Sequence, residues 1–337
     1  MKKIALEEHF STEEHLDCLV SIIEKNYPVP EVGQQEKVLE RELPFLAPAR
    51  REYTLNRLYD IGEGRLQEMD EAGIDMQVLS LVSPGVQVLD PPAGTALAKK
   101  INDKVSEAVR KYPERFAGLA SIAPQNPGEA ADELERAVKE LGLRGASINS
   151  HTKGEYLDNK KYWVIFERAE KLGVPIYIHP RLPSPDMVKP YLDYPRIDSA
   201  MCGFAHEVSL HALRLICGGV FDQFPKLKII LGHLGEALPY WLWRIDSTWQ
   251  KGPEANKLKK LPSQYIKDNF FVTTSGMFWQ PPLICAYLAL GADRILFAVD
   301  YPMQSNEEAV QFMELAPLCD GDKEKICHLN AEELLML

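Results

Sequence analysis

The stretch Ile295-Leu296-Phe297-Ala298-Val299-Asp300 is an unbroken apolar run that stops at a carboxylate. The stretch Leu227–His233 has the same form, because Ile229-Ile230-Leu231 leads through one glycine to a histidine. Continuous apolar runs, unlike alternating ones, are typical of parallel strands that are buried on both faces. These two stretches therefore predict an α/β fold built on a parallel sheet.

Similar short apolar runs recur along the chain, and each is followed by a helical pattern. Two of these patterns have clear ends: one opens at Asn126-Pro127 and stops at Gly142, and Lys160–Leu172 stops at Gly173. Eight strands alternating with helices over about 300 residues predict a (β/α)8 TIM barrel, since right-handed crossovers close the sheet at that count. The predicted strands are Lys3–His9, Met76–Val82, Phe116–Ala123, Leu143–Asn149, Pro175–His179, Leu227–His233, Phe270–Ser275 and Arg294–Asp300.

Residues 11–63 interrupt this regular spacing with a long insertion between the first and second strands. The segment Ser11–Glu63 is rich in proline, glutamate and arginine, and connections of this length are uncommon unless they are functional or disordered. Because it follows the first strand, it is expected on the C-terminal face of the barrel, where barrel active sites lie. We expect a lid or a subunit contact, and the alternative is a mobile surface insertion.

Length and charge limit the class of protein. A chain of 337 residues fits two average domains or one large barrel, and the strand pattern favours a single barrel domain over residues 1–337. The formal net charge of −11 repels polyanions, so nucleic acid is not an expected partner. The N-terminus lacks an apolar leader, and no segment approaches the roughly 18 apolar residues of a membrane span. With six scattered cysteines and no Cys-x-x-Cys pair, we expect a cytoplasmic protein without a membrane partner.

Polar side chains end several of the predicted strands. Glu7 and His9 share one face of the first strand because strand side chains alternate, while His179 ends the fifth strand and Asp300 the eighth. Taken singly, each has an ordinary explanation, such as solvated surface or a structural histidine. Together they meet on the C-terminal face of the barrel. Two imidazoles and two carboxylates suit Zn²⁺ or Mn²⁺ better than Mg²⁺ or Ca²⁺, so we predict one divalent metal ion there.

Two further polar residues each allow a functional and a structural interpretation. Glu236 follows the sixth strand and His233, and it is either a site residue or a carboxylate stabilising the first turn of a helix. Arg244, with Asp246 beside it, is either an anion anchor or a member of a surface ion pair. The remaining histidines are expected to be ordinary: His206 and His211 as helix capping or packing residues, and His15, His151 and His328 as surface residues.

Several of these motifs together resemble one family, the amidohydrolase-related decarboxylases. That family includes gamma-resorcylate (2,6-dihydroxybenzoate), 2,3-dihydroxybenzoate and salicylate decarboxylases, with aminocarboxymuconate-semialdehyde decarboxylase further away. The resemblance covers nearly the whole chain outside the insertion. It rests on Ala5-Leu6-Glu7-Glu8-His9-Phe10, Ile178-His179-Pro180-Arg181, the stretch from Gly219 to Glu236, Trp243-Arg244-Ile245-Asp246, Thr273-Thr274-Ser275-Gly276 and the stretch from Gly291 to Asp300.

The resemblance implies Glu7, His9, His179 and Asp300 as metal ligands, with His233 and Glu236 as a catalytic pair beside them. The Glu-x-His form of the first strand is similar to the gamma-resorcylate enzyme and favours a 2,6-dihydroxybenzoate-like substrate. Gly276-Met277-Phe278 and Tyr301-Pro302-Met303-Gln304 depart from the usual family residues. The pocket residues of the insertion, Met277 and Met303 are therefore expected to decide which substrate is accepted.

The implied reaction is nonoxidative loss of CO₂ from a hydroxylated aromatic acid, without an organic cofactor. The metal would chelate the carboxylate and the ortho hydroxyl, Asp300 would protonate the ring carbon, and Arg181 or Arg244 would orient the anion. The resemblance also implies a homodimer or homotetramer. Two alternatives remain: a metal-dependent hydrolase or hydratase of a lactone or ring-cleavage acid that activates water, and a non-catalytic binding barrel.

Overall fold

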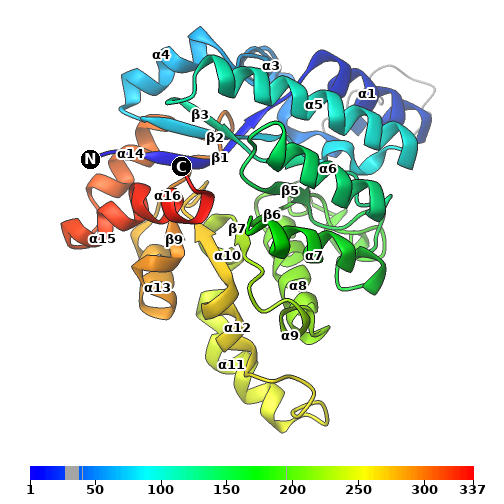
Figure 1. Ribbon diagram of the computed structural model, residues 1–337, viewed down its shortest axis with the longest axis vertical. Helices are drawn as coiled ribbons and strands as arrows, with labels where there is room; N and C mark the ends of the chain where they lie inside the picture. The colour runs from blue at the N-terminus through cyan, green and yellow to red at the C-terminus, as the bar shows by residue number, and fades with distance from the viewer. Residues whose placement is uncertain (27–37, 40, 195) are drawn as a thin grey trace.

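The computed structural model describes residues 1–26, 38, 39, 41–194 and 196–337, and shows parallel strands surrounded by helices (Figure 1). Residues 27–37 and 40 of the predicted insertion lie outside the described residues. The strands are β1 (Ile4–Phe10), β2 (Met76–Leu81), β3 (Phe116–Gly118), β4 (Ala120–Ser121), β5 (Ala146–Asn149), β6 (Ile176–His179), β7 (Ile229–Leu231), β8 (Phe270–Thr273) and β9 (Ile295–Leu296). Every predicted strand is present, most of them shortened at their ends.

The strands form a ring in the order in which they occur along the chain. One parallel sheet joins β1, β2 and β3, and a second joins β4 through β9. The two sheets are continuous, because β3 and β4 are halves of one predicted strand and Leu119 N between them donates to Leu79 O at 2.9 Å. At the other edge, Leu6 N donates to Phe297 O at 3.2 Å and His9 N to Tyr301 O at 2.7 Å. The predicted TIM barrel is confirmed.

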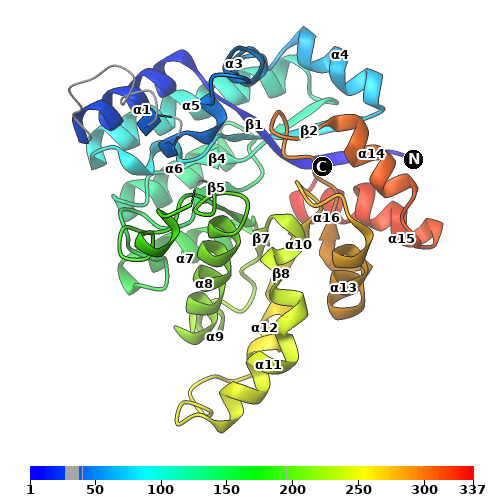
Figure 2. The ribbon, with the colours of Figure 1, turned by 180° about the vertical axis from the view of Figure 1, so that it is seen from behind.

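Helices follow the strands and cover the outside of the barrel (Figures 1 and 2). They are α1 (Glu13–Asn26), α3 (Arg51–Tyr59), α4 (Glu63–Ala72), α5 (Pro91–Lys111), α6 (Pro127–Lys139), α7 (Trp163–Leu172), α8 (Gly203–Cys217), α9 (Val220–Gln223), α10 (His233–Glu236), α11 (Leu238–Lys251), α12 (Pro262–Asn269), α13 (Gln280–Leu290), α14 (Asn306–Glu314), α15 (Asp320–Glu324) and α16 (Asn330–Leu335). Shorter turns are η1 (Pro44–Leu46), η2 (Gly85–Val88), η3 (Lys160–Tyr162), η4 (Lys189–Tyr191), η5 (Ala292–Arg294) and η6 (Lys325–Leu329).

The predicted helix ends are partly right. α7 stops at Gly173, whose φ of 71° lets it terminate the helix in the left-handed region, as expected. The prediction for α6 is wrong at its C-terminus, because the helix ends at Lys139 and Gly142, with φ 74°, lies in the turn beyond it. No helix in the described part of the chain is both long and apolar enough to pass through a bilayer.

Two apolar layers hold the barrel together. The inner layer fills the barrel with inward-facing side chains and includes Ala331 and Leu335 of α16. Asn330 of the same helix donates to Ile295 O at 2.8 Å, at the first residue of β9. α16 therefore covers the N-terminal end of the barrel. The opposite end is the one where β1 and β6 finish. The outer layer packs the strands against the surrounding helices.

The described part of the insertion is helical rather than an extended loop. It contains α1, η1 and α3, which lie beside α5 at one side of the barrel in Figures 1 and 2. A small core of its own holds these elements together, formed by Leu19, Ile23, Leu43 and Leu46. This core explains why a proline-rich segment can form a wall beside the C-terminal face of the barrel. Whether it acts as a lid stays a prediction.

Candidate metal centre and active site

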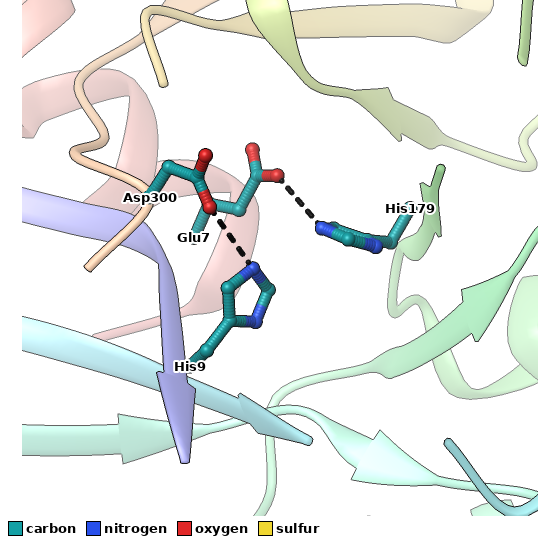
Figure 3. A group of neighbouring side chains, drawn as sticks. All are labelled: Glu7, His9, His179 and Asp300. Atoms are coloured by element: carbon teal, nitrogen blue, oxygen red, sulfur yellow. Dashed lines mark ion pairs between the residues drawn. The ribbon is translucent and has the colours of Figure 1, made fainter. Parts of the chain in front are cut away.

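Four of the predicted site residues meet at the C-terminal end of the barrel. Glu7, His9, His179 and Asp300 each offer one ligand atom, and these atoms lie within 4.8 Å of one another. His9 Nε2 lies 3.3 Å from Asp300 Oδ1, and His179 Nε2 lies 3.2 Å from Glu7 Oε1 (Figure 3). The four side chains come from β1, β6 and the segment after β9, as the strand prediction required.

The burial of this cluster fits a cation. Glu7 is 1% exposed and His9 2% exposed, yet Glu7 Oε1 and His9 Nε2 have no hydrogen-bond partner among the described residues. Buried polar atoms are nearly always paired, because an unpaired one costs free energy. A divalent ion between these atoms would satisfy both, and the mixed nitrogen and oxygen donors suit Zn²⁺ or Mn²⁺.

Hydroxyl groups orient the Glu7 carboxylate. Tyr177 Oη and Ser275 Oγ donate to Glu7 Oε2, and Thr273 Oγ1 donates to the same oxygen at 3.3 Å. This leaves Oε1 facing His179. Gly232 allows the arrangement, because a Cβ there would stand 3.0 Å from Glu7 Oε2 and 3.2 Å from Tyr177 Oη. The glycine before His233 therefore permits the close approach of Glu7 and Tyr177 to this backbone.

A hydroxyl group also orients the imidazole of His9. Its Nδ1 lies 3.2 Å from Ser80 Oγ on β2, which leaves Nε2 facing Asp300. A hydrogen bond to the second ring nitrogen is the usual way in which a metal-binding imidazole is held in one orientation. Neither Ser80 nor the hydroxyls around Glu7 were predicted, because serine, threonine and tyrosine within a strand carry no sequence signal for such a contact.

His233 and Glu236 form a hydrogen-bonded pair next to this cluster. His233 Nδ1 lies 2.6 Å from Glu236 Oε1, while His233 Nε2 lies 3.7 Å from Glu7 Oε1 and 4.0 Å from Asp300 Oδ2. The backbone from His233 to Ala237 has positive φ at every residue, so it turns sharply within α10. Conformations this rare persist where surrounding structure enforces them, and they concentrate at functional sites. The Glu236 carboxylate therefore pairs with His233, and it does not serve to stabilise the first turn of a helix.

Charge and burial shift the pKa values of the site in opposite directions. Burial lowers the pKa of His9 to about 4, and it lowers that of His179 as well. Burial also raises the pKa of Asp300 to about 7, and the Glu7 charge adds to that rise. Burial opposes a charged His233, yet the Glu236 and Glu7 carboxylates raise its pKa to about 10. Burial would raise the pKa of Glu7, but His233 and His179 hold it well below its usual range.

A cavity of about 1350 Å³ opens above the cluster. His9, His179, His233 and Asp300 line it, and the insertion contributes further lining residues. The insertion contributes Leu19, Ile23, Leu43, Phe45 and Arg50, and the loops after β6 and β9 contribute Arg181, Met303 and Gln304. The described part of the insertion therefore forms a wall of the cavity.

One of the two predicted arginines and one of the two predicted methionines line the cavity, and the other two do not. Arg181 lines the cavity and donates from Nη1 to His151 O at 3.2 Å, and burial lowers its pKa to about 10. Arg244 is exposed on α11 and is not among the residues that line the cavity. Met303 lines the cavity, whereas Met277 packs against the outer apolar layer. Of these two arginines, Arg181 is therefore the one that lines the cavity within one chain.

The surface prediction is wrong for two of the three histidines. His15 and His151 are buried and His328 is partly buried. His15 Nδ1 lies 2.9 Å from Ser11 Oγ, and His151 Nε2 lies 3.1 Å from Leu182 O. Their neighbours along the chain are polar, but those neighbours and distant backbone groups supply hydrogen bonds that make burial possible. His206 and His211 lie in α8, as predicted.

Comparisons with known proteins extend these observations. The profile of the family described as Amidohydrolase matches residues 28–337. The gamma-resorcylate decarboxylase of Polaromonas sp. (strain JS666) is 39% identical over 345 residues, covering 99% of this chain and 98% of that protein. A solved 2,6-dihydroxybenzoate decarboxylase in complex with 2,6-dihydroxybenzoate has a TM-score of 0.87 and 36% identity, and the match covers 100% of both chains.

The 5-carboxyvanillate decarboxylase of Novosphingobium aromaticivorans was solved with bound manganese and 3-methoxy-4-hydroxy-5-nitrobenzoic acid. It has a TM-score of 0.92 and 38% identity, covering 100% of this chain and 97% of that one. Manganese in this relative agrees with the donor set found here. Similarity of this extent over whole chains identifies a family, and so the chain belongs to the amidohydrolase family, in its branch of metal-dependent decarboxylases.

Proposed function

We propose that this chain is a metal-dependent, nonoxidative decarboxylase of a hydroxylated aromatic acid, with a 2,6-dihydroxybenzoate-like substrate. One observation carries the proposal: Glu7, His9, His179 and Asp300 meet at the end of the cavity, and Glu7 Oε1 and His9 Nε2 have no hydrogen-bond partner among the described residues. Relatives that match over their whole length are named for acids of this class. We assign the metal to these four residues and the reaction to the cavity above them.

A Zn²⁺ or Mn²⁺ ion held by the four residues would supply positive charge that neutralises the substrate carboxylate and its ortho oxygen and orients the ring. Arg181, which lines the same cavity, adds a fixed positive charge for the anionic substrate. This local charge explains how an anion can bind to a chain whose net charge is −11.

Asp300 faces the cavity and serves as the general acid. It donates a proton to the ring carbon that carries the carboxylate, and a new C–H bond forms there. The C–C bond then breaks, its electron pair returns to the ring, and CO₂ leaves, so that aromaticity is restored. His233 lies 4.0 Å from Asp300 through Nε2 and is held by Glu236 through Nδ1, which suits it to return a proton to Asp300 from solvent.

The test is turnover of the protein loaded with Mn²⁺ or Zn²⁺. Incubation with 2,6-dihydroxybenzoate is expected to yield resorcinol and CO₂ in equal amounts, and the reaction in D₂O should place one deuterium on the ring. His179→Ala is expected to abolish both turnover and stoichiometric metal binding. Hydrolysis of a lactone without release of CO₂ from any hydroxybenzoate would favour the metal-dependent hydrolase or hydratase instead.

A 5-carboxyvanillate-like acid is the second candidate substrate. The relative named for that acid has a TM-score of 0.92. The cavity is also larger than one ring needs, and Arg50 lines it in addition to Arg181, so a second carboxylate has a cation available. Comparing kcat/KM for the two acids under identical metal loading decides between them.

We infer a cytoplasmic homodimer or homotetramer as the working form. Tyr240 and Trp243 on α11 are 78% and 79% exposed, and Leu288 on α13 is 78% exposed. Large exposed aromatic side chains on one helix are typical of a protein interface. Arg244 shares that helix, so in an oligomer we expect it near the same contact. Light scattering should give a mass of at least two chains, and Trp243→Glu should shift it to one.

A further inference from the structure

We propose that Glu8 and Arg65, which the mechanism above does not use, position His9 and Asp300 relative to each other. The proposal rests on the assignment of these two residues as metal ligands. Both Glu8 and Arg65 lie on the outer side of the barrel, at the contact between β1 and residues 297–301, which we name the closing seam.

The closing seam is a weak point of the barrel. The regular pairing of β8 with β9 ends at Leu296. Beyond it, β1 is joined to residues 297–301 by an isolated bridge between Glu8 and Tyr301 and by the hydrogen bond from Leu6 N to Phe297 O. Asp300 itself has a φ of 77°, a left-handed conformation that is costly for a residue with a side chain. The ligand is therefore presented by irregular backbone that needs support from other groups.

Glu8 supplies part of that support. Its side chain is fully buried, Oε1 accepts a hydrogen bond from Val299 N at 2.9 Å, and Oε2 accepts one from Tyr301 N at 3.4 Å. These two amides flank Asp300. One carboxylate thus accepts from the backbone N–H groups on both sides of the ligand and supports the left-handed conformation of the residue between them.

Arg65 of α4 supports the other strand of the seam. It is 1% exposed, and Nη2 donates to His9 O at 2.6 Å and to Arg57 O at 2.8 Å. Its guanidinium lies 4.5 Å from the centre of the Tyr301 ring, so the same group contacts both strands. Its Nε and Nη1 are buried without a hydrogen-bond partner among the described residues, and the Tyr301 ring lies against the same guanidinium.

The two residues therefore set one distance that the metal site depends on. His9 Nε2 and Asp300 Oδ1 are 3.3 Å apart although the two residues lie at opposite ends of the chain, and their backbones meet along the closing seam. Ligand geometry tolerates small errors only, and loss of supporting contacts typically weakens metal binding by about 10–100-fold. Glu8 and Arg65 are positioning residues, since their hydrogen bonds go to backbone atoms and not to the ligand atoms of His9 and Asp300.

The test is Glu8→Gln, which keeps the shape and one acceptor but places an amide nitrogen opposite one of the two backbone N–H groups. We expect metal-free E8Q to bind Mn²⁺ about 10–100-fold more weakly than the unaltered protein, measured by the EPR signal of free Mn²⁺. At saturating Mn²⁺, kcat for 2,6-dihydroxybenzoate should stay reduced while KM changes little. Arg65→Lys should show the same loss of Mn²⁺ affinity and of kcat, and it serves as the test variant if E8Q does not fold.

The matched control is Glu133→Gln. Glu133 is also a buried carboxylate, which accepts hydrogen bonds from Asn102 at 2.7 Å and Arg136 at 2.8 Å, but it lies on α6 away from the seam. We expect it to lose stability while keeping full Mn²⁺ affinity. Unaltered Mn²⁺ affinity in both E8Q and Arg65→Lys, or an equal loss in E133Q, would overturn the proposal. Absence of Mn²⁺ binding by the unaltered protein would overturn the metal site as well.

Discussion

The two oxygens of Glu7 have different surroundings. Oε2 accepts hydrogen bonds from Tyr177, Thr273 and Ser275, whereas Oε1 faces His179 without a hydrogen-bond partner among the described residues. A carboxylate held in this way offers one oxygen to a cation and cannot rotate to offer both. The hydroxyl groups therefore decide how Glu7 can bind a metal.

Tyr177→Phe should weaken metal binding without changing the fold. Removing one donor frees Glu7 to rotate, so we expect the dissociation constant for Mn²⁺ to rise about tenfold or more. Calorimetric titration of the metal-free protein measures this change. Tyr162→Phe is the control, because Tyr162 is equally buried but donates to Glu155 on the outside of the barrel. Equal Mn²⁺ affinity in the two variants would contradict the role given to Tyr177.

Arg181→Met should raise KM more than it lowers kcat. Its guanidinium lines the cavity, and a charge-assisted hydrogen bond to an anion contributes about 1.5–3 kcal/mol, or roughly 10–100-fold in affinity. Steady-state kinetics with 2,6-dihydroxybenzoate provide the measurement. Arg168→Met on α7 removes an arginine that pairs with Asp132 and Glu135 instead, and it should leave KM as it is. A fall in kcat alone for Arg181→Met would place this residue in proton transfer and not in binding.

Helix α8 ties two site-bearing loops together through one side chain. Glu207 accepts hydrogen bonds from Ser150 Oγ at 2.9 Å and Tyr156 Oη at 3.0 Å, both after β5. It also accepts one from Ser184 N at 3.3 Å, in the loop after β6 that carries Arg181. The helix thereby sets the position of a loop that forms part of the cavity.

Glu207→Gln should affect stability and substrate binding together. The amide cannot accept all three hydrogen bonds, so we expect the free energy of unfolding to fall by about 1–3 kcal/mol and KM to rise as the loop of Arg181 relaxes. Urea denaturation and kinetics give the two quantities. Glu167→Gln, at an exposed position on α7, should change neither. If KM stayed constant while stability fell, α8 would support the fold without positioning the loop.

Across the whole molecule, buried imidazoles make stability depend on pH. Burial lowers the pKa of His15 to about 4 and the pKa values of His151 and His211 to about 3, from an ordinary value of 6.5. The unfolded chain therefore binds protons that the folded chain does not. This contribution to stability is fully present above pH 6.5 and is lost as the pH falls toward 4.

We expect the free energy of unfolding to decrease between pH 7 and pH 5, by up to about 1.4 kcal/mol per pH unit for each of these histidines. Urea denaturation of the metal-free protein measures this slope without contributions from metal binding. His15→Gln should flatten the slope, while His206→Gln, at an exposed position on α8, should keep it. A slope that His15→Gln leaves unaltered would show that His15 is protonated in the folded protein.

The sequence by itself determined the barrel and the residues that meet at its C-terminal end. Apolar runs have a local cause, burial on both faces, and each run that stops at Glu7, His9, His179 or Asp300 places that residue at the same end of a parallel barrel. No long-range information was needed, because closure of the ring brings all strand ends together.

Only the tertiary structure decided which groups support those residues. The hydroxyls on Glu7, the contacts of Glu8 and Arg65 across the closing seam, and the burial of His15 depend on partners from other elements. The tertiary structure also showed that Arg181 lines the cavity, whereas Arg244 is exposed on α11. Strand periodicity is a property of neighbouring residues, whereas hydrogen-bond pairing and burial are set by side chains that the fold brings together from distant positions.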